Sequence, residues 1–351
     1  MFTNYQPAVS VIIPVYNALP YLTEALESVK NQSLTNIEIV CLNDGSTDGS
    51  LEVLNKYAEM DQRFVVIDKP NEGYGMTMNR GIEVARGRYV AILEPDDYVD
   101  TRMYEVLLGV ADALNVDIVR SQATLFYGDK DFRKFSAPSP IGGEPGARLS
   151  LKNDSIPTGP LFQTWTALYK RELIGSLRPA YHTTPGAMFQ DSGFWFKAYA
   201  SAESYAYVNQ PFYYYRRDNA SSSTSVLKQS SKKARGIIDE FRLTFSDLLR
   251  IEPEVPRAVA NIYWLQFCQA CYSAMWLAED NDSRRDLLRL AKTVISESLN
   301  SKLSFRTAAT PARVLCNMIV LAPRAFISLS RIISTLRNSK ERMKVGNAKR
   351  N

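Results

Sequence analysis

Short runs of β-branched and other apolar residues alternate with longer segments of mixed polarity along the first 120 residues. Short unbroken apolar runs predict buried strands, whereas apolar positions that recur every three or four residues predict helices. The predicted strands cover residues 9–15, 37–42, 64–68, 89–93 and 117–121, and the predicted helices cover about 18–32, 48–60, 75–85 and 101–115. This alternation is typical of an α/β fold with a mostly parallel sheet and covering helices.

The pattern changes after residue 121. Residues 128–160 are rich in Gly, Pro and Ser, which predicts a long loop or irregular segment. Aromatic strand-like pieces at 162–169, 204–208 and 212–216 follow, around a helix near 191–200. From Lys228 onward the apolar positions have a helical period, so we place a domain boundary near residue 225.

The composition is that of a folded protein. The chain has 351 residues, of which 45% are apolar and 23% are charged, enough for about two domains with a substantial core. Disordered and fibrous classes are therefore excluded. Because His182 is the single histidine, a His-rich zinc site is excluded, and a Ser-His-Asp triad would have to use that residue. We expect His182 to be an ordinary loop residue, with a ligand contact as the alternative because Asp191 follows nine residues later.

The charge is uneven along the chain. The net charge is +5, but residues 306–351 hold ten basic residues and one acidic residue, which leaves the first 305 residues at −4. This distribution of charge does not fit a protein that binds nucleic acid over most of its surface. Four cysteines do not suggest a disulfide framework, and the C-x-x-C pair Cys268 and Cys271 lies in a helical pattern that favours core packing. The cysteine usage favours a reducing, cytoplasmic setting, and the longest apolar stretch, 314–322, is too short to span a bilayer, so we expect no membrane crossing.

Polar residues follow three of the predicted strands, at the edge where a parallel sheet places its ligands. Taken alone, the run 43–48 after the second strand is explained by a β-turn plus a helix N-cap at Ser46, Thr47 or Asp48. Asp96 and Asp97 are harder to explain in that way, because adjacent carboxylates at the end of an apolar strand repel each other unless a cation neutralises them. Oxygen ligands beside phosphates favour Mg²⁺ or Mn²⁺.

The strand-end motifs together resemble those of glycosyltransferase family 2, the inverting nucleotide-sugar glycosyltransferases with a GT-A fold. The motifs occur in the family's order over residues 8–217: Val11-Ile12-Ile13-Pro14-Val15-Tyr16-Asn17, Asn43-Asp44-Gly45-Ser46-Thr47-Asp48, Asn71-Glu72-Gly73 with Asn79 and Gly81, Glu94-Pro95-Asp96-Asp97, and Gln190-Asp191. The resemblance implies a GT-A type, Rossmann-like domain over residues 1–225, with a nucleotide-sugar half at about 8–122 and an acceptor half at about 123–225. Residues 226–351 form the predicted helical C-terminal region.

The resemblance also implies roles for individual residues. Pro14, Tyr16 and Asn17 would frame the nucleobase, and Asp44 would accept a hydrogen bond from a uracil-like ring. The implied donor-binding set is Pro14, Tyr16, Asn17, Asp44, Asn71, Gly73, Asn79 and Asp96. Asp97 would bind Mn²⁺ or Mg²⁺ together with Asp96, and Asp191 would be the base that takes the proton of the acceptor hydroxyl. Helix capping is the alternative interpretation of Asp191.

Three positions depart from the family pattern. Glu94 replaces the usual first Asp, Met78 replaces an Arg, and Gln190 replaces the Glu that commonly precedes the base. Two other functions remain as alternatives: a nucleotidyltransferase that makes nucleotide-sugars, and a catalytically idle nucleotide-sugar binding module. The first normally has a basic, Gly-rich loop after the first strand, and the second should lack Asp97 or Asp191.

We therefore predict a metal-dependent inverting glycosyltransferase that moves a sugar from a nucleotide-sugar, with UDP as the expected nucleotide, to a saccharide or glycolipid acceptor in surface polysaccharide synthesis. Its tail is predicted to be amphipathic and to attach peripherally to anionic lipid at the inner face of the membrane. Packing of the tail on the protein body is the alternative. Several aromatic residues are candidates for sugar stacking or for core packing: Trp165, Phe189, Trp195 and 212–215.

Overall fold

The computed structural model divides the chain into two compact units, Met1–Val226 and Leu227–Asn351. The described residues are 6–128, 131–135, 144–150, 163–185, 189–219, 231–251, 255–278, 280–323 and 325–326.

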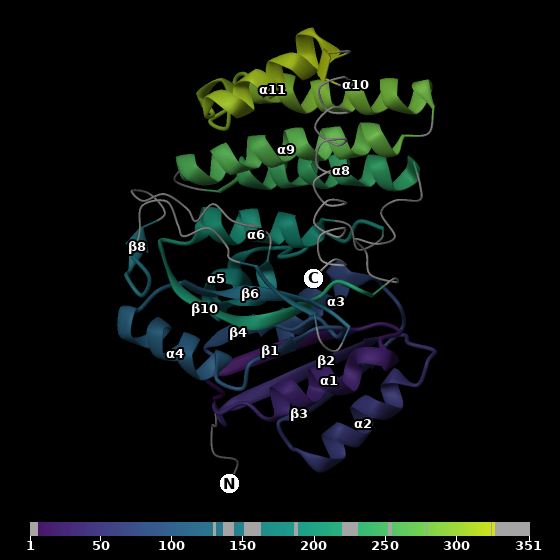
Figure 1. The fold of residues 1–351 in the computed structure, drawn as a ribbon. Coiled ribbons are helices and arrows are strands. Elements are labelled where there is room, and N and C mark those ends of the chain that lie inside the picture. The colour runs from purple at the N-terminus through teal and green to yellow at the C-terminus, as the bar shows by residue number, and fades with distance from the viewer. Residues whose placement is uncertain are drawn as a thin grey trace, which may run out of the picture. The chain divides into compact units, whose positions relative to one another are not determined.

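The first unit is built on a mixed sheet with strand order β3-β2-β1-β4-β9-β6-β10-β5, to which β7 and β8 add at β6 and β10 (Figure 1). Its strands are β1 Val9–Val15, β2 Ile37–Asp44, β3 Phe64–Lys69, β4 Tyr89–Ile92, β5 Tyr98–Val99, β6 Ile118–Tyr127, β7 Asp131–Phe135, β8 Leu149–Ser150, β9 Ala167–Lys170 and β10 Ser204–Arg216. The pairs β1–β2, β2–β3, β1–β4 and β6–β10 are parallel, whereas β9 is antiparallel to both of its neighbours. The predicted α/β class with a mostly parallel sheet is confirmed.

In the described part of the first unit, six helices connect these strands: α1 Leu19–Lys30, α2 Ser50–Met60, α3 Tyr74–Val84, α4 Met103–Leu114, α5 Arg171–Ser176 and α6 Gln190–Ser201. All residues of β1 and β2 are buried, which explains why these strands lack the alternation of a half-exposed sheet. Helix α3 packs tightly on them, since a Cβ atom at Gly81 would stand 2.6 Å from Ile12 Cγ2. The sheet and its helices therefore share one apolar core.

The irregular segment predicted at 128–160 is wrong in part, because β7 and β8 lie within it. The strand-like pieces at 204–208 and 212–216 are in fact one strand, β10. Its pairing with β6 shifts register around Pro211, which lacks the N–H of a regular ladder residue. The sequence around Pro211 therefore predicts two separate strands, although one strand continues through this position with a bulge.

The second unit is helical, as predicted (Figure 1). Its described elements are α8 Ser231–Leu248, α9 Arg257–Leu277, α10 Asn281–Ser298, the 3₁₀ turn η3 Phe305–Thr307 and α11 Thr310–Leu321. The side chain of Trp264 in α9 is fully buried and donates to the Leu303 carbonyl oxygen over 2.8 Å. Cys268 and Cys271 are also buried in α9, which agrees with core packing rather than a metal site.

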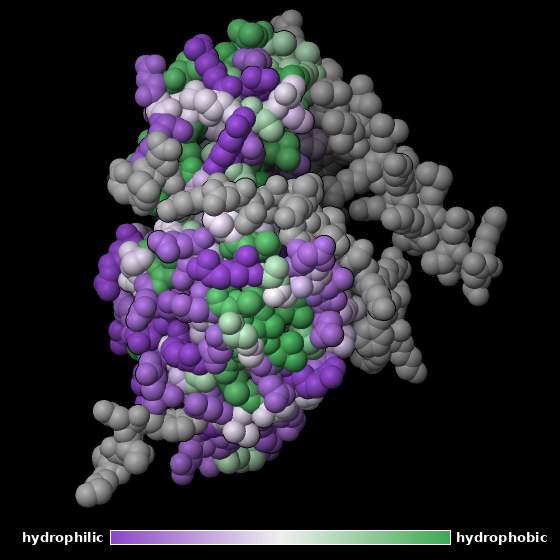
Figure 2. Space-filling view, turned by 90° about the vertical axis from the view of Figure 1, so that its left-hand side faces the viewer, coloured by the Kyte–Doolittle hydropathy of each residue, from purple (hydrophilic) through white to green (hydrophobic). Residues whose placement is uncertain are grey.

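Helix α11 buries Ala312, Cys316 and Ile319, so this part of the basic tail packs on its own unit. Val314 and Leu321 remain exposed on the same helix. The rest of the predicted amphipathic tail, from residue 327 onward, lies outside the described residues. Across the described ranges, no helix combines the length and apolar character needed to cross a bilayer. Figure 2 shows one face of the molecule, where hydrophilic side chains surround a patch of apolar ones.

Candidate functional site

A pocket of about 560 Å³ opens at the carboxyl edge of the sheet. The chain leaves β1 toward β2 on one side, whereas β4 lies on the other side of β1, and such a reversal of strand order opens a crevice. Eight of the predicted site residues line this pocket: Pro14, Tyr16, Asn17, Asp44, Asn71, Gly73, Asp96 and Asp191. Asn79 and Asp97 do not line it.

The loop after β1 is tied to the loop after β2. The backbone N–H of Asn17 donates to Ser46 Oγ over 3.0 Å, and Asn17 Oδ1 accepts from the backbone N–H of Thr47 over 2.8 Å. Asp48 accepts from the backbone N–H groups of Leu19 and Ser50, each over 3.0 Å. The run 43–48 therefore makes turn contacts, which also shape the pocket rim, but the N-cap of α2 is Gly49 and not one of the residues 46–48.

Asp44 organises the floor of the pocket. Its side chain is 6% exposed and forms an ion pair with Lys69. The same carboxylate accepts from the backbone N–H of Glu72 over 2.8 Å and of Gly73 over 3.0 Å. Gly45 allows this loop to approach, because its φ is +71° and a Cβ atom there would meet the Asn71 nitrogen at 2.8 Å. The loop 71–73 is thus held by the strand end opposite it.

Besides Asp44, three further carboxylates line the pocket: Glu94, Asp96 and Asp191. Glu94 accepts from the Tyr74 hydroxyl over 2.8 Å, and Asp96 accepts from Asn219 Nδ2 over 2.7 Å. Burial, with the nearby charges of Asp96 and Asp191, raises the pKa of Glu94 to about 8 although the bond from Tyr74 opposes the shift. This crowding of negative charge is what a bound cation would relieve.

These carboxylates would hold a metal ion only together with oxygen atoms of a bound substrate. Within the described ranges, no three His, Cys, Asp or Glu side chains stand close enough together to hold a metal ion on their own. Mg²⁺ and similar ions are commonly held by one or two carboxylates plus substrate phosphates. Asp96 and Glu94 fit that second arrangement because both carboxylates line the pocket.

Asp97 points into the fold instead. It is 1% exposed, and its carboxylate accepts from the Tyr213 hydroxyl over 2.8 Å and from the backbone N–H of Arg216 over 2.7 Å. Burial, with the charge of Asp96 next, holds the pKa of Asp97 well above its ordinary range. The structure therefore does not bring the predicted metal ligand Asp97 to the pocket, because its oxygens fasten β10 to the loop after β4.

Asn79 is likewise used inside the fold. Its side-chain amide donates to the Tyr181 carbonyl oxygen and accepts from the Tyr181 N–H, each over 2.8 Å. Nearby, a Cβ atom at Gly75 would stand 1.9 Å from the carbonyl oxygen of His182. These contacts clamp the segment that leads to Asp191 against α3, so Asn79 supports the site from behind.

Asp191 lies in the first turn of α6, half-buried and in the pocket lining. The residue at the N-cap position is Phe189, with φ +59°, so Asp191 is not the cap itself. Its Oδ1 accepts from the backbone N–H of Ser192 over 2.8 Å, which fixes the carboxylate direction. His182, for which a ligand contact was the alternative interpretation, is buried beside Lys197 Nζ at 3.4 Å and does not line the pocket.

Several lining residues were missed or left undecided by the sequence, among them Tyr74, Asn219, Trp165 and Tyr215. Tyr74 directly follows the 71–73 motif, and Asn219 follows the end of β10 as the other polar residues follow their strands. The rule that strand ends carry the site could have found Asn219. No periodic signal separates Trp165 and Tyr215 from their buried aromatic neighbours.

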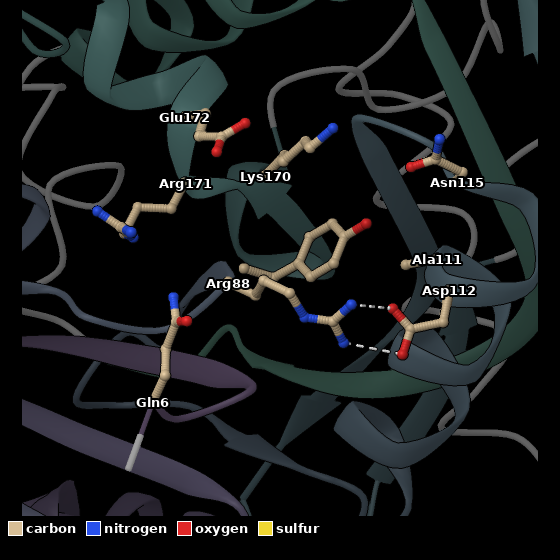
Figure 3. Close-up of a pocket in the computed structure, with 9 residues that line it drawn as sticks. Gln6, Arg88, Ala111, Asp112, Asn115, Lys170, Arg171 and Glu172 are labelled. Carbon is tan, nitrogen blue, oxygen red and sulfur yellow. Dashed lines mark hydrogen bonds and ion pairs between the residues drawn. The ribbon is translucent and has the colours of Figure 1, made fainter. Parts of the chain in front are cut away.

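A second hollow of about 580 Å³ lies at the opposite, amino edge of the sheet (Figure 3). It includes Gln6 before β1, Arg88 before β4 and Lys170 at the end of the antiparallel β9. Arg88 forms a two-point ion pair with Asp112, and both distances are 2.9 Å (Figure 3). No predicted site residue lines this hollow, so we regard the carboxyl edge as the candidate site.

Comparison with known proteins finds relatives of this chain both in sequence and in fold. Residues 10–177 match the model of "Glycosyl transferase family 2". The putative glycosyltransferase EpsH of Bacillus subtilis is 34% identical over 217 residues, which is 60% of this chain and 61% of that protein. The chain thus spans less than two thirds of that relative's length.

Solved structures share the fold over most of the chain. S. aureus TarS 1–349 in complex with UDP-GlcNAc aligns with a TM-score of 0.69 and 20% identity, covering 92% of this chain and 88% of that one. The mannosyltransferase PcManGT from Pyrobaculum calidifontis, in complex with GDP-Man and Mn²⁺, aligns with a TM-score of 0.50 and 18% identity over 94% of this chain and 87% of that one. At these identities the likeness concerns the fold.

Proposed function

We propose that this chain, which belongs to glycosyl transferase family 2, transfers a sugar from a nucleotide-sugar to a saccharide or lipid-linked saccharide. One observation carries the proposal: the strand-end residues, Asp96 and Asp191 converge on a single pocket at the carboxyl edge of the sheet. Those positions would hold the nucleotide, the diphosphate and the acceptor in one line.

The donor half of the pocket suits a nucleoside diphosphate. Tyr16 is 55% exposed at the rim, where its ring can stack on a base, and Asp44 at the floor can accept from a ring N–H. Asn71 and Gly73 complete this side. A UDP-linked sugar is the donor we favour, since TarS shares the fold and binds UDP-GlcNAc.

Asp96, with Glu94 beside it, is the residue that would hold Mn²⁺ or Mg²⁺ together with the donor phosphates. A bound divalent ion supplies positive charge where the diphosphate leaving group becomes more negative. Asn219 fixes one oxygen of Asp96, so that carboxylate is oriented before any ligand arrives. Asp97 would act one step away, by holding β10 and thereby Asn219 in place.

Asp191 would act as the general base. The acceptor hydroxyl oxygen attacks the anomeric carbon, the bond from that carbon to the diphosphate oxygen breaks, and the hydroxyl proton passes to the Asp191 carboxylate. Attack from the face opposite the leaving group inverts the configuration. The half-buried position of Asp191 in the pocket wall suits this role, because a carboxylate there is open to substrate yet already oriented by Ser192.

A release assay tests the proposal. The full chain is incubated with a panel of UDP- and GDP-sugars, with Mn²⁺ or with chelator, and the products are separated by chromatography. We expect release of nucleoside diphosphate that chelator abolishes, because water can replace a missing acceptor. Pyrophosphate from sugar phosphate and nucleoside triphosphate would identify a nucleotidyltransferase, and binding without release would identify an idle module.

We further propose that the protein works at the inner face of the membrane, attached through its basic tail, in surface polysaccharide synthesis. The support is the net charge of +9 in residues 306–351 beside a body of −4. Replacing Lys340, Arg342 and Lys344 by Gln in the full chain should reduce co-sedimentation with anionic vesicles at low salt. The matched control replaces Arg285, Arg289 and Lys292 of α10, and equal binding by both variants would contradict tail attachment.

A further inference from the structure

The structure separates the aromatic residues that the sequence left undecided. Trp195 and Tyr213 are 1% and 0% exposed and belong to the core. Tyr214 is stacked on Tyr98, with ring centroids 4.4 Å apart and planes at 9°. Trp165, although only 8% exposed, and the half-buried Tyr215 line the pocket that holds Asp96 and Asp191. Of the described candidates at 165, 195 and 212–215, these two alone line the pocket.

Trp165 and Tyr215 form one aromatic wall. Tyr213 and Tyr215 project from the same face of β10, and Trp165 lies against both, with centroid distances of 4.1 Å and 5.0 Å and interplanar angles of 31° and 36°. Arg217 holds the outer ring: its Nη1 donates to the Tyr215 hydroxyl over 3.1 Å, and its guanidinium lies 5.3 Å from the ring centre. The wall is therefore oriented before a ligand binds.

The wall is fastened to the reacting part of the pocket. Tyr213, under Trp165, donates to Asp97 and accepts from the backbone N–H of Glu94 over 3.1 Å. The turn that carries Trp165, η1 Thr164–Thr166, contacts both α6, which carries Asp191, and β10. A ring stacked on the wall would thus stand at a fixed position relative to both Asp96 and Asp191.

We propose that Tyr215, backed by Trp165 and held by Arg217, is the acceptor subsite and that the acceptor is a pyranoside. The inference rests on the proposed function. A sugar ring has an apolar C–H face and a polar rim, which suits an aromatic face beside hydrogen-bonding groups. A simple lipid alcohol has no such ring to place. The acceptor hydroxyl of the stacked sugar would then face Asp191 from the side opposite the donor.

The test uses octyl β-D-glucopyranoside, octyl β-D-galactopyranoside and octyl N-acetyl-β-D-glucosaminide as acceptors, with 1-octanol as the sugar-free probe. The donor is the nucleotide-sugar that wild type hydrolyses fastest. Wild type should glycosylate at least one octyl glycoside and not 1-octanol. Tyr215→Ala should raise the KM for that glycoside roughly tenfold or more, the loss expected for one stacked ring, with a change of less than about twofold in donor KM.

Two further variants keep the test decisive. Tyr215→Phe retains the ring and should restore the acceptor KM to within about threefold of wild type. Tyr214→Ala removes the same side chain from the other face of the same strand, and its acceptor KM and donor hydrolysis should match wild type. A melting curve for each variant shows that it is folded.

The outcomes distinguish the two levels of inference. If wild type releases no nucleoside diphosphate from any donor, the proposed function fails. If wild type hydrolyses donor but uses none of the glycosides, or uses 1-octanol as well as them, the pyranoside subsite is wrong. Equal effects of Tyr214→Ala and Tyr215→Ala on the acceptor KM would also overturn it.

Discussion

The two edges of one sheet carry hollows of similar size, about 560 Å³ at the carboxyl edge and 580 Å³ at the amino edge, yet their chemistry differs. At the amino edge, Arg88 and Asp112 satisfy each other in solvent, with side chains 53% and 43% exposed. At the carboxyl edge, Asp44 and Asp97 are buried and accept from backbone N–H groups, and Glu94 and Asp96 accept from neighbouring side chains. Size alone therefore does not identify the site.

The difference lies in which groups are fixed before a ligand arrives. Polar groups that the fold already orients need little reorganisation when charge develops on a substrate, and a partly dry pocket strengthens each contact. Exposed ion pairs are screened by water and salt, so they hold little oriented charge for a ligand. The carboxyl edge thus has the features of a reactive site, and substitutions at the two edges should have very different consequences.

The largest effect is expected at Asp191. Asp191→Asn preserves the shape of the side chain but removes its capacity to take a proton, so transfer should slow by roughly 10² to 10⁴-fold. Donor affinity, measured by calorimetry, should stay within severalfold of wild type. The matched control is Asp112→Asn at the amino edge, which should transfer at the wild-type rate. Transfer by Asp191→Asn within severalfold of wild type would send the search for a base to Glu94.

The next effect separates the two adjacent carboxylates. Asp96→Ala removes the pocket-facing oxygens, so the concentration of Mn²⁺ needed for half-maximal turnover should rise at least about tenfold, as for loss of a metal contact. Its free energy of unfolding should change little, since the half-buried carboxylate accepts from Asn219, whereas the backbone carbonyl that accepts from Arg216 Nε is kept in the variant.

Asp97→Ala should behave in the opposite way. It leaves the Tyr213 hydroxyl and the Arg216 N–H without their buried acceptor, which should lower the free energy of unfolding by at least about 2 kcal/mol. Urea denaturation measures this loss. Asp97→Asn, which keeps one carbonyl oxygen, should lose less. A stable Asp97→Ala protein that needs much more Mn²⁺ would restore the sequence-based assignment of Asp97 to the metal.

A smaller effect is expected behind the pocket. Asn79→Ala breaks both hydrogen bonds to Tyr181, at a cost of about 1–2 kcal/mol in unfolding free energy because water can reach this half-buried position in part. Transfer should fall only severalfold. Arg80→Ala is the control on the same helix, since its exposed pair with Glu83 contributes at most about 0.5 kcal/mol. Equal free energies of unfolding for the two variants would show that the hydrogen bonds between Asn79 and Tyr181 do not stabilise the fold.

The sequence predicted the parallel part of the sheet closely because its strands are buried on both faces. The prediction for residues 9–15 coincides with β1, whose seven residues are all buried. The antiparallel additions were harder: β7 and β8 lie in a Gly- and Pro-rich segment, and α5 is only six residues long. Such short elements are stabilised by neighbours far along the chain, which a local pattern does not contain.

The sequence predicted the edge of the sheet where the candidate site lies, but it did not predict which side chains face the pocket. Strand-end motifs pointed to the edge of the sheet where the pocket lies, and a solved structure shares the fold there. Whether Asp96 or Asp97 faces the pocket depends on the turn after β4 and on β10, more than a hundred residues away. Asn79 likewise meets Tyr181 across 102 positions. Adjacent residues point to different sides of a turn, so one motif cannot assign both.

The smallest effect is expected at the amino edge, in Arg88→Ala. The bidentate geometry of its pair with Asp112 is good, but both side chains are about half exposed, so water and salt weaken the attraction (Figure 3). The unfolding free energy should fall by about 1 kcal/mol or less, and the loss should shrink further in 1 M NaCl. Transfer and donor KM should equal those of wild type. A double-mutant cycle with Asp112→Ala isolates the pair itself, and it should give a coupling of no more than about 1 kcal/mol. A tenfold loss of transfer in Arg88→Ala would mean that the amino edge also contributes to catalysis, and the contrast between the two edges would no longer hold.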